Sequence, residues 1–243
     1  SLNAMVYARG APQDYDGWAD QGADGWRYRD VLPYFRQAEH NEVFSGEAHG
    51  QDGPLGVSNQ SHTLPLTKAW VKACQEAGIP FNPDFNGEHQ EGVGYYQATV
   101  GNGRRSSAAI GYLRPAESRP NLTVVTNAFT HKITIENGRA IGAVFTADSQ
   151  ATEIRCNKEV IVSCGSINSP QLLMLSGIGP REHLQKFGIP VIVDSPQVGK
   201  NLQDHLQLRI TYRLNKPISF NDQYHSYLEK IKIGMEYYIK RSG

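Results

Sequence analysis

A strand-like run, a glycine turn and a helix-like run, in that order, constrain the fold of this chain more than any other feature. The run Val-Ile-Val at residues 160–162 is β-branched, which predicts a buried strand. Gly165 permits a tight turn, Ser169 and Pro170 predict a helix N-cap and first turn, and Gly177 is expected to end that helix. These residues leave two alternatives open: an ordinary βα unit, or one that presents backbone N–H groups to a phosphate.

Composition excludes several classes of partner. The 243 residues include 24 Lys+Arg and 24 Asp+Glu, so the formal net charge is zero and no basic surface for nucleic acid is expected. We find no apolar run long enough for a transmembrane helix. Neither the histidines nor Cys74, Cys156 and Cys164 have metal-ligand spacing, so no metal site is expected. So few cysteines favour a reducing compartment, and we expect a cytoplasmic protein or one peripheral to a membrane.

Hydrophobic periodicity predicts a chain of mixed α and β structure. Residues 1–30 are rich in aromatic side chains and are interpreted as an ordered loop, and residues 44–60 and 80–103 as polar loops. Asn137-Gly138 is a preferred two-residue hairpin turn. Helices are expected at residues 30–39, 66–77, 107–113, 181–187 and 224–240. Strands are expected at residues 122–126, 132–136, 140–146, 152–156, 191–193 and 206–213.

The run from Gly165 to Gly179 resembles the second signature of the glucose–methanol–choline (GMC) oxidoreductases, which are FAD-dependent. It fits that pattern without a mismatch at the fixed positions Gly165, Ser169, Pro170, Leu172, Leu173, Ser176, Gly177, Ile178 and Gly179. The resemblance implies that Gly165 lies at the cofactor.

The opening residues, 1–10, resemble the second half of the first signature of the same family. The resemblance implies that the Asn3 side chain lies close to the flavin ring and that Ala4, Met5 and Val6 supply neighbouring contacts. A flavin needs polar groups at its reactive edge and apolar walls elsewhere, which suits these residues. The alternative is a frayed terminus without a role.

Two further stretches extend the resemblance. The strand near residues 121–130 corresponds to one whose edge binds the adenine through backbone groups, which implies that role for Thr130. Residues 198–205, Val-Gly-Lys-Asn-Leu-Gln-Asp-His, match a third family motif. Asp204 and His205 could form an acid–base pair, but neighbours on an extended chain point to opposite faces. We therefore interpret Asp204 as lining the cofactor side.

The resemblance implies a mixed α/β (α+β) fold that holds part of an FAD-binding domain and much of an antiparallel-sheet substrate domain. We divide it into a cofactor-site loop with its connection (1–60), substrate-domain portions (61–120 and 206–243) and an FAD-binding portion (121–205). Neither the main dinucleotide loop nor the catalytic histidine of the family is present. We therefore expect the middle of such an enzyme, with no catalytic residue and no activity alone.

The implied activity is that of choline- and alcohol-dehydrogenase-like members, which oxidise a primary alcohol to an aldehyde by hydride transfer to the flavin. A small-molecule alcohol is the expected substrate, and a complementing chain or a second copy is the expected protein partner. Two alternatives remain: a structural module that self-associates without a cofactor, and an FAD-containing lyase of the same family.

Overall fold

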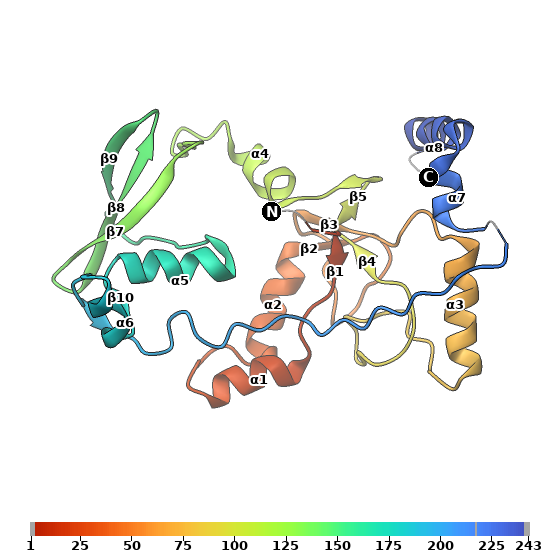
Figure 1. Ribbon diagram of the computed structural model, residues 1–243, viewed down its shortest axis with the longest axis horizontal. Coiled ribbons are helices and arrows are strands. Elements are labelled where there is room, and N and C mark those ends of the chain that lie inside the picture. The colour runs from red at the N-terminus through yellow and green to blue at the C-terminus, as the bar shows by residue number, and fades with distance from the viewer. Residues whose placement is uncertain (1–2, 217, 241–243) are drawn as a thin grey trace. The chain divides into compact units, whose positions relative to one another are not determined.

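The computed structural model describes residues 3–216 and 218–240. These residues form two compact units, which are described separately. The first unit comprises Ser1–Leu122 and Tyr212–Gly243, and the second comprises Thr123–Thr211. The chain is of mixed α and β structure with small sheets, as the sequence predicted (Figure 1).

The first unit combines helices with pairs of very short strands. Its strands are β1 (Val6–Tyr7), β2 (Glu39–Asn41), β3 (Leu55–Val57), β4 (Gln97–Ala98), β5 (Val100–Gly101) and β6 (Arg104–Arg105). Its helices are α1 (Pro12–Asp20), α2 (Tyr28–Ala38), α3 (Pro65–Glu76), the π-helix η1 (Ala109–Leu113), α4 (Arg114–Ala116), α7 (Phe220–His225) and α8 (Tyr227–Lys240). β1 pairs antiparallel with β4, β2 parallel with β3, and β5 antiparallel with β6.

Helix α1 corrects the expectation of a continuous loop over residues 1–30. Pro12 occupies its first turn, and the Asp14 carboxylate accepts the backbone N–H of Ala11 at 2.7 Å. The Tyr15 ring then packs on Trp18, with centroids 5.2 Å apart, and on Phe35 of α2 at 5.7 Å. The aromatic side chains therefore form the contact between α1 and α2, which sequence periodicity over so short a helix did not reveal.

The second unit is built on a three-stranded antiparallel sheet of β7 (Phe129–Glu136), β8 (Arg139–Ala147) and β9 (Gln150–Arg155). Asn137 and Gly138 both have positive φ and form the predicted hairpin turn. The other elements are α5 (Gly165–Leu175), β10 (Ile178–Gly179), α6 (Arg181–Lys186) and β11 (Val193–Asp194), and β10 pairs parallel with β11. Ser176, which follows α5, connects this helix to the sheet, because its hydroxyl accepts the backbone N–H of Ile133 at 2.8 Å.

Three predicted strands are absent: residues 122–126, 160–162 and 206–213 form no ladder. A strand exists only where its backbone groups pair with a neighbour, and no strand among the described residues pairs with these segments. Their side chains are accordingly open to solvent, with Ile161 78% exposed and Leu206 100% exposed. The strand expected at residues 191–193 is present only from Val193.

The helix of the glycine-rich motif begins earlier than predicted. It starts at Gly165, so Pro170 lies inside it rather than in its first turn. Ser169 still bonds to the helix start, because its hydroxyl accepts the backbone N–H of Cys164 at 3.0 Å. The turns were predicted correctly: Gly165 and Gly177 both have positive φ. The helices expected near residues 30–39, 66–77, 107–113 and 181–187 are present, and the one at 224–240 is divided at Ser226.

Candidate functional site

The segment from Asn3 to Tyr7, here called the opening loop, is held in a defined conformation in the first unit. Val6 pairs with Ala98 across β1 and β4, and the Met5 carbonyl accepts the backbone N–H of Thr99 at 2.7 Å. Met5 has φ of 64°, a left-handed conformation that is rare for a side chain of this size. Asn3 stabilises it, because its side-chain oxygen accepts the Met5 N–H at 2.9 Å. The opening loop is therefore ordered, not frayed.

Arg105 of β6 anchors the first residue of the opening loop. Its guanidinium donates to the side-chain oxygen of Asn3 at 3.0 Å and to the Asn3 carbonyl at 3.2 Å. Sequence reasoning assigned no role to this side chain. The structure adds it to the site, on contacts between residues about a hundred positions apart that no local pattern could reveal.

A buried charged cluster adjoins the end of the opening loop. Arg9 and Glu39 form an ion pair at 2.6 Å, and the Glu39 side chain is 0% exposed. His49 lies 3.0 Å from the other Glu39 oxygen and 2.8 Å from Asp84. Arg9 also donates to the Ala48 carbonyl at 2.6 Å. Charges this deeply buried are tolerated because each is paired and hydrogen-bonded.

The surroundings move the pKa values of these groups in opposite directions. Burial alone would raise the pKa of Glu39, but hydrogen bonds from His49, Asn41 and Gly50 and the charge of Arg9 hold it below its ordinary value. Burial alone would lower the pKa of His49, but its hydrogen bonds to Glu39 and Asp84 raise it. Burial also raises the pKa of Tyr7. The surroundings thus favour the ionised form of Glu39 and the protonated form of His49.

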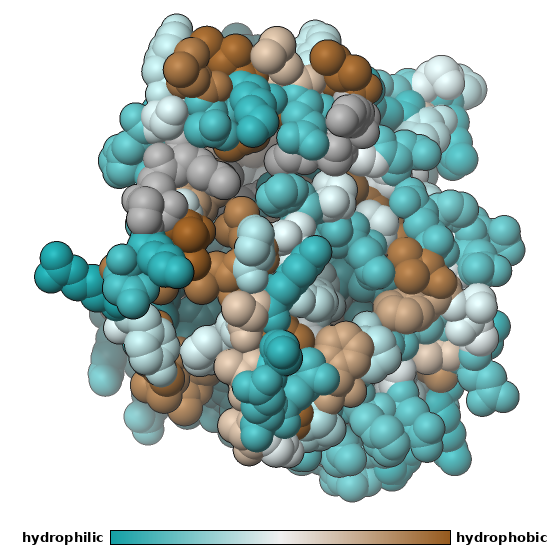
Figure 2. All heavy atoms as spheres, turned by 90° about the vertical axis from the view of Figure 1, so that its right-hand side faces the viewer, coloured by the Kyte–Doolittle hydropathy of each residue, from teal (hydrophilic) through white to brown (hydrophobic). Residues whose placement is uncertain are grey.

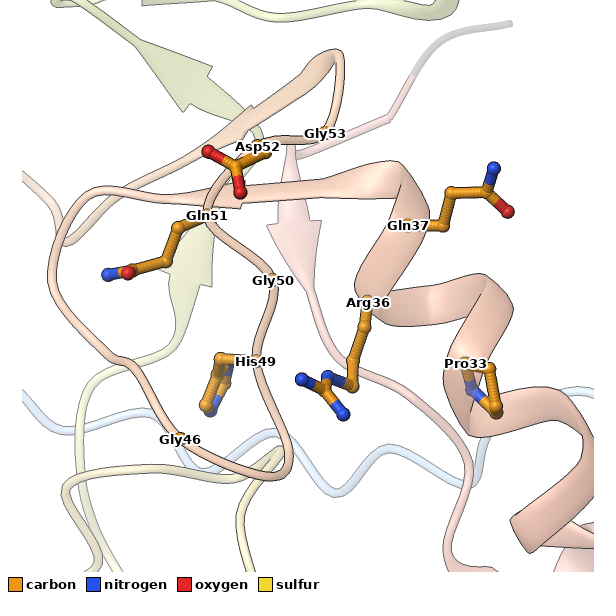
Figure 3. Close-up of a pocket in the computed structure, with 9 residues that line it drawn as sticks. All are labelled: Pro33, Arg36, Gln37, Gly46, His49, Gly50, Gln51, Asp52 and Gly53. Atoms are coloured by element: carbon orange, nitrogen blue, oxygen red, sulfur yellow. The ribbon is translucent and has the colours of Figure 1, made fainter.

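A cavity of about 550 Å³ lies beside this cluster. Figure 3 shows Arg36 extending from α2 toward the loop that carries His49. The lining residues are Pro33, Arg36, Gln37, Gly46, His49, Gly50, Gln51, Asp52 and Gly53. Sequence reasoning considered His49 only as a metal ligand and found no suitable spacing. Among the described residues no metal-binding group of side chains is present.

The second unit brings together two of the sequence motifs. A cavity of about 470 Å³ is lined by Ser166, Ile167, Pro170 and Met174 of α5 and by Gly199 to Gln203. Gly165 and Asp204 immediately adjoin these lining residues in the chain. A Cβ atom built on Gly165 would meet nothing within 4 Å, so the helix N-terminus is open to a ligand. Residues of the motifs at 165–179 and 198–205 therefore line one cavity.

Asp204 and His205 do not form a side-chain pair of catalytic type. The Asp204 carboxylate accepts the backbone N–H of His205 at 2.8 Å, and both residues are exposed. Thr130 lies in β7 opposite Phe145, next to a β-bulge that separates it from Lys132. The residue that this shift in register leaves without a partner is His131, whereas Thr130 keeps Phe145 as its partner in the ladder.

The seven predicted cofactor residues thus divide between the units. Asn3, Ala4, Met5 and Val6 lie together in the first, and Thr130, Gly165 and Asp204 in the second.

Comparison with known proteins decides the family. A family model described as GMC oxidoreductase matches residues 1–207. The chain belongs to the GMC oxidoreductase family. This confirms the resemblance on which the sequence analysis rested, and with it an FAD-dependent oxidoreductase family that acts on CH–OH groups.

Curated relatives of this GMC oxidoreductase include choline dehydrogenases. The mitochondrial choline dehydrogenase of Homo sapiens is 45% identical over 243 residues, which is all of this chain and 41% of that protein. An oxygen-dependent choline dehydrogenase of Brucella suis biovar 1 is 44% identical over the same 243 residues, 44% of its length. The chain therefore spans about two fifths of the length of these relatives.

Solved structures of the family share this fold. An FAD-dependent oxidoreductase from Chaetomium thermophilum matches with a TM-score of 0.92 and 30% identity, over 99% of this chain and 44% of that one. Pyridoxine 4-oxidase from Mesorbium loti matches with a TM-score of 0.78 and 31% identity, over 84% of this chain and 40% of that one.

The residues present fit FAD, the cofactor of this family. A flavin nucleotide needs apolar walls with a few fixed polar groups. Each unit offers both: exposed Val6 stands beside the fixed amide of Asn3 in the first, and exposed Ile167 and Leu202 stand beside the open N-terminus of α5 at Gly165 in the second.

Proposed function

We propose that the protein that carries this sequence is an FAD-dependent dehydrogenase that oxidises a primary alcohol of choline type to an aldehyde. FAD supplies the acceptor for the hydride that leaves the alcohol carbon. The observation that carries the proposal is the 45% identity, across every residue of the chain, to a protein named as a choline dehydrogenase. The family model and the Chaetomium structure support the cofactor.

The residues of this chain would bind and orient the cofactor. In the proposal, the Asn3 amide faces the flavin ring, fixed by Arg105, and Ala4, Met5 and Val6 exclude water from the ring. The hydrogen bonds that hold Met5 in its left-handed conformation keep this wall from moving.

The second unit would bind the nucleotide part of FAD. Thr130, next to the register shift of β7, would contact the adenine through its backbone. Gly165 would let the cofactor approach the N-terminus of α5, and Asp204, which follows the cavity-lining residue Gln203 in the chain, would lie on the cofactor side. In this scheme residues 121–205 are the FAD-binding portion, and 1–60, 61–120 and 206–243 are the loop and substrate-domain portions named above.

The location of the protein also remains part of the proposal. No helix among the described residues is long and apolar enough to cross a membrane. The three cysteines are unpaired, which supports a reducing compartment such as the cytoplasm.

A visible absorption spectrum tests the cofactor assignment first. The purified protein is mixed with FAD and desalted, and a retained flavin band is the expected result. A colourless protein after this treatment contradicts FAD binding by the chain.

Anaerobic mixing with alcohols then tests the activity. The 243-residue chain alone is expected to show no reaction, because no catalytic residue is assigned in it. In the protein that carries this sequence, choline is expected to bleach the flavin band, whereas ethyltrimethylammonium, which has the same quaternary ammonium group but no hydroxyl group, is expected to leave it unchanged. If FAD is retained but neither choline nor any other primary alcohol bleaches it, the dehydrogenase assignment is wrong, and a lyase of the same family becomes the better hypothesis.

A further inference from the structure

Five residues form a closed ring of hydrogen bonds behind the opening loop. His49 lies between two carboxylates, with Nδ1 at 3.0 Å from Glu39 and Nε2 at 2.8 Å from Asp84. Glu39 accepts from the Arg9 guanidinium at 2.6 Å, and Asp84 accepts the backbone N–H of Asn86 at 3.0 Å. The Asn86 side-chain oxygen accepts the backbone N–H of Arg9 at 2.7 Å, which closes the ring.

The ring fixes the chain at the point where the opening loop ends. Asn86 contacts the backbone on both sides of Ala8, because its amide also donates to the Tyr7 carbonyl at 3.0 Å. A second set of hydrogen bonds connects Glu39 to β1. Asn41 donates to Glu39 at 2.8 Å and to Gln97 at 2.9 Å, and Gln97 pairs with Tyr7 across β4 and β1. The backbone of Tyr7 and Arg9 is therefore held from Asn86 and Gln97, and His49 joins the two carboxylates, Glu39 and Asp84, to which these amides are connected.

With both carboxylates ionised, the ring places a carboxylate oxygen at each nitrogen of His49 and is complete only when both nitrogens carry a proton. A neutral imidazole has one N–H and one lone pair, so one of the two carboxylates would face a lone pair. Asn41 Nδ2 also lies 3.2 Å from Nδ1 of His49, but its two hydrogens serve oxygens of Glu39 and Gln97. Nδ1 is thus left to donate to Glu39. The ring closes only around the imidazolium.

The groups around His49 agree with this charge state. The two carboxylates contact it directly, and the Phe44 ring packs against it with centroids 5.6 Å apart. Arg9 contacts Glu39, which lies between Arg9 and His49. Arg36 and Asp52 line the same cavity as His49 (Figure 3). The combined effect of these groups favours the protonated form of His49. The pKa of His49 is therefore raised, although burial alone would lower it.

We propose that His49 is a positioning residue for the flavin-facing loop: its imidazolium closes the ring and holds the opening loop, and loss of its proton opens the ring and loosens that loop. The proton leaves to solvent through the cavity that His49 lines. The ring stands on contacts within this chain, whereas its effect on the flavin rests on the proposed function.

Hydrogen exchange of the peptide that covers residues 3–9 tests the proposal without FAD. Protection, corrected for intrinsic exchange rates, is compared between about pH 5.5 and about pH 8.5 in the wild type, in His49→Gln and in His40→Gln. His40 is the matched control, because it is an exposed histidine on β2 next to Glu39. Wild type and His40→Gln are expected to lose protection by about tenfold as pH rises, the size expected for one charge-assisted hydrogen bond.

His49→Gln is expected to show low protection in this segment at every pH, because Gln has donors on one terminal atom only and would face the second carboxylate with its oxygen. Equal, pH-independent protection in the wild type overturns the proposal by itself, so the result does not depend on whether the variant folds. Nitrogen NMR of the wild-type ring gives a second readout, and a neutral His49 at pH 5.5 also overturns the proposal.

A flavin readout separates this proposal from the proposed function. If FAD binds, its affinity in the wild type should weaken over the same pH range in which protection of residues 3–9 falls, and His49→Gln should lack that dependence. If FAD does not bind, the proposed function fails while the exchange experiment still decides the role of His49. An affinity for FAD that follows pH identically in wild type and His49→Gln contradicts the link to the loop.

Discussion

Glu39 is the residue on which the first unit most depends. Its carboxylate is fully buried and satisfies Arg9, His49, Asn41 and the backbone of Gly50 at once. Removing one partner of a buried ion pair is costly because the other charge stays buried without compensation. A single carboxylate therefore stabilises the segment around Arg9 and the loop around His49 together.

Glu39→Gln is expected to lower the free energy of unfolding of the first unit by about 3 kcal/mol, since Arg9 loses its counter-charge. Urea unfolding followed by tryptophan fluorescence measures it, because Trp18, Trp26 and Trp70 all lie in this unit. Glu47→Gln, at an exposed position of the same loop, is the control and should change stability by less than about 0.5 kcal/mol. Equal effects of the two changes would contradict the role of Glu39.

The pH dependence of stability follows from the two pKa shifts. The raised pKa of His49 gives stability that is complete below its unfolded value of 6.5 and is lost as pH rises through the folded pKa. The lowered pKa of Glu39 gives stability that is complete above its unfolded value of 4.5 and is lost as pH falls through the folded pKa. The cluster should therefore contribute most between these two values, and urea midpoints measured across this range should decline on both sides. A urea midpoint that keeps rising above neutral pH would contradict the predicted loss of stability as His49 loses its proton.

At the scale of elements, α1 shows how short helices here depend on local geometry and a few contacts. Gly17 lies inside the helix, and Gly22 follows its C-cap with φ of 102°. A Cβ atom at either glycine would meet nothing within 4 Å. Any difference between alanine substitutions at the two positions therefore reports backbone conformation alone.

Gly17→Ala is expected to stabilise the first unit by about 0.5–1 kcal/mol, because alanine loses less backbone freedom in a helix than glycine. Gly22→Ala is expected to destabilise it by about 1 kcal/mol, because a left-handed conformation is unfavourable for a residue with a Cβ atom. Thermal unfolding of the two variants is the measurement. Changes of the same sign in the melting temperatures of the two variants would contradict the described end of α1.

At the scale of the whole molecule, many large apolar side chains are open to solvent. Residues 206–210 are extended, with Leu206, Leu208 and Ile210 all exposed, and α8 exposes Tyr227, Leu228 and Ile239. Figure 2 shows apolar side chains at the upper end of the face on which α8 lies. Apolar surface of this extent is typical of regions that other polypeptide covers. The formal net charge of zero offers little repulsion against association.

The purified chain is therefore expected to associate with itself as its concentration rises. Replacing Leu206 and Leu208 together with Lys should shift size-exclusion elution toward the monomer without changing the fold, because these side chains are fully or almost fully exposed. Tyr34→Lys, at an exposed position on α2, is the control and should leave elution unchanged. A monomer at every concentration would contradict the predicted partner.

The sequence by itself determined the family, the hairpin at Asn137-Gly138 and most helices, because turn chemistry, helix periodicity and signature motifs are local. The strands expected at residues 122–126, 160–162 and 206–213 did not form, because a strand needs a partner that local pattern does not supply. Only the tertiary structure placed Arg105 on Asn3 and enclosed His49 between Glu39 and Asp84. These contacts join residues from separate parts of the chain, and buried charge becomes functional only where folding removes water and supplies every partner.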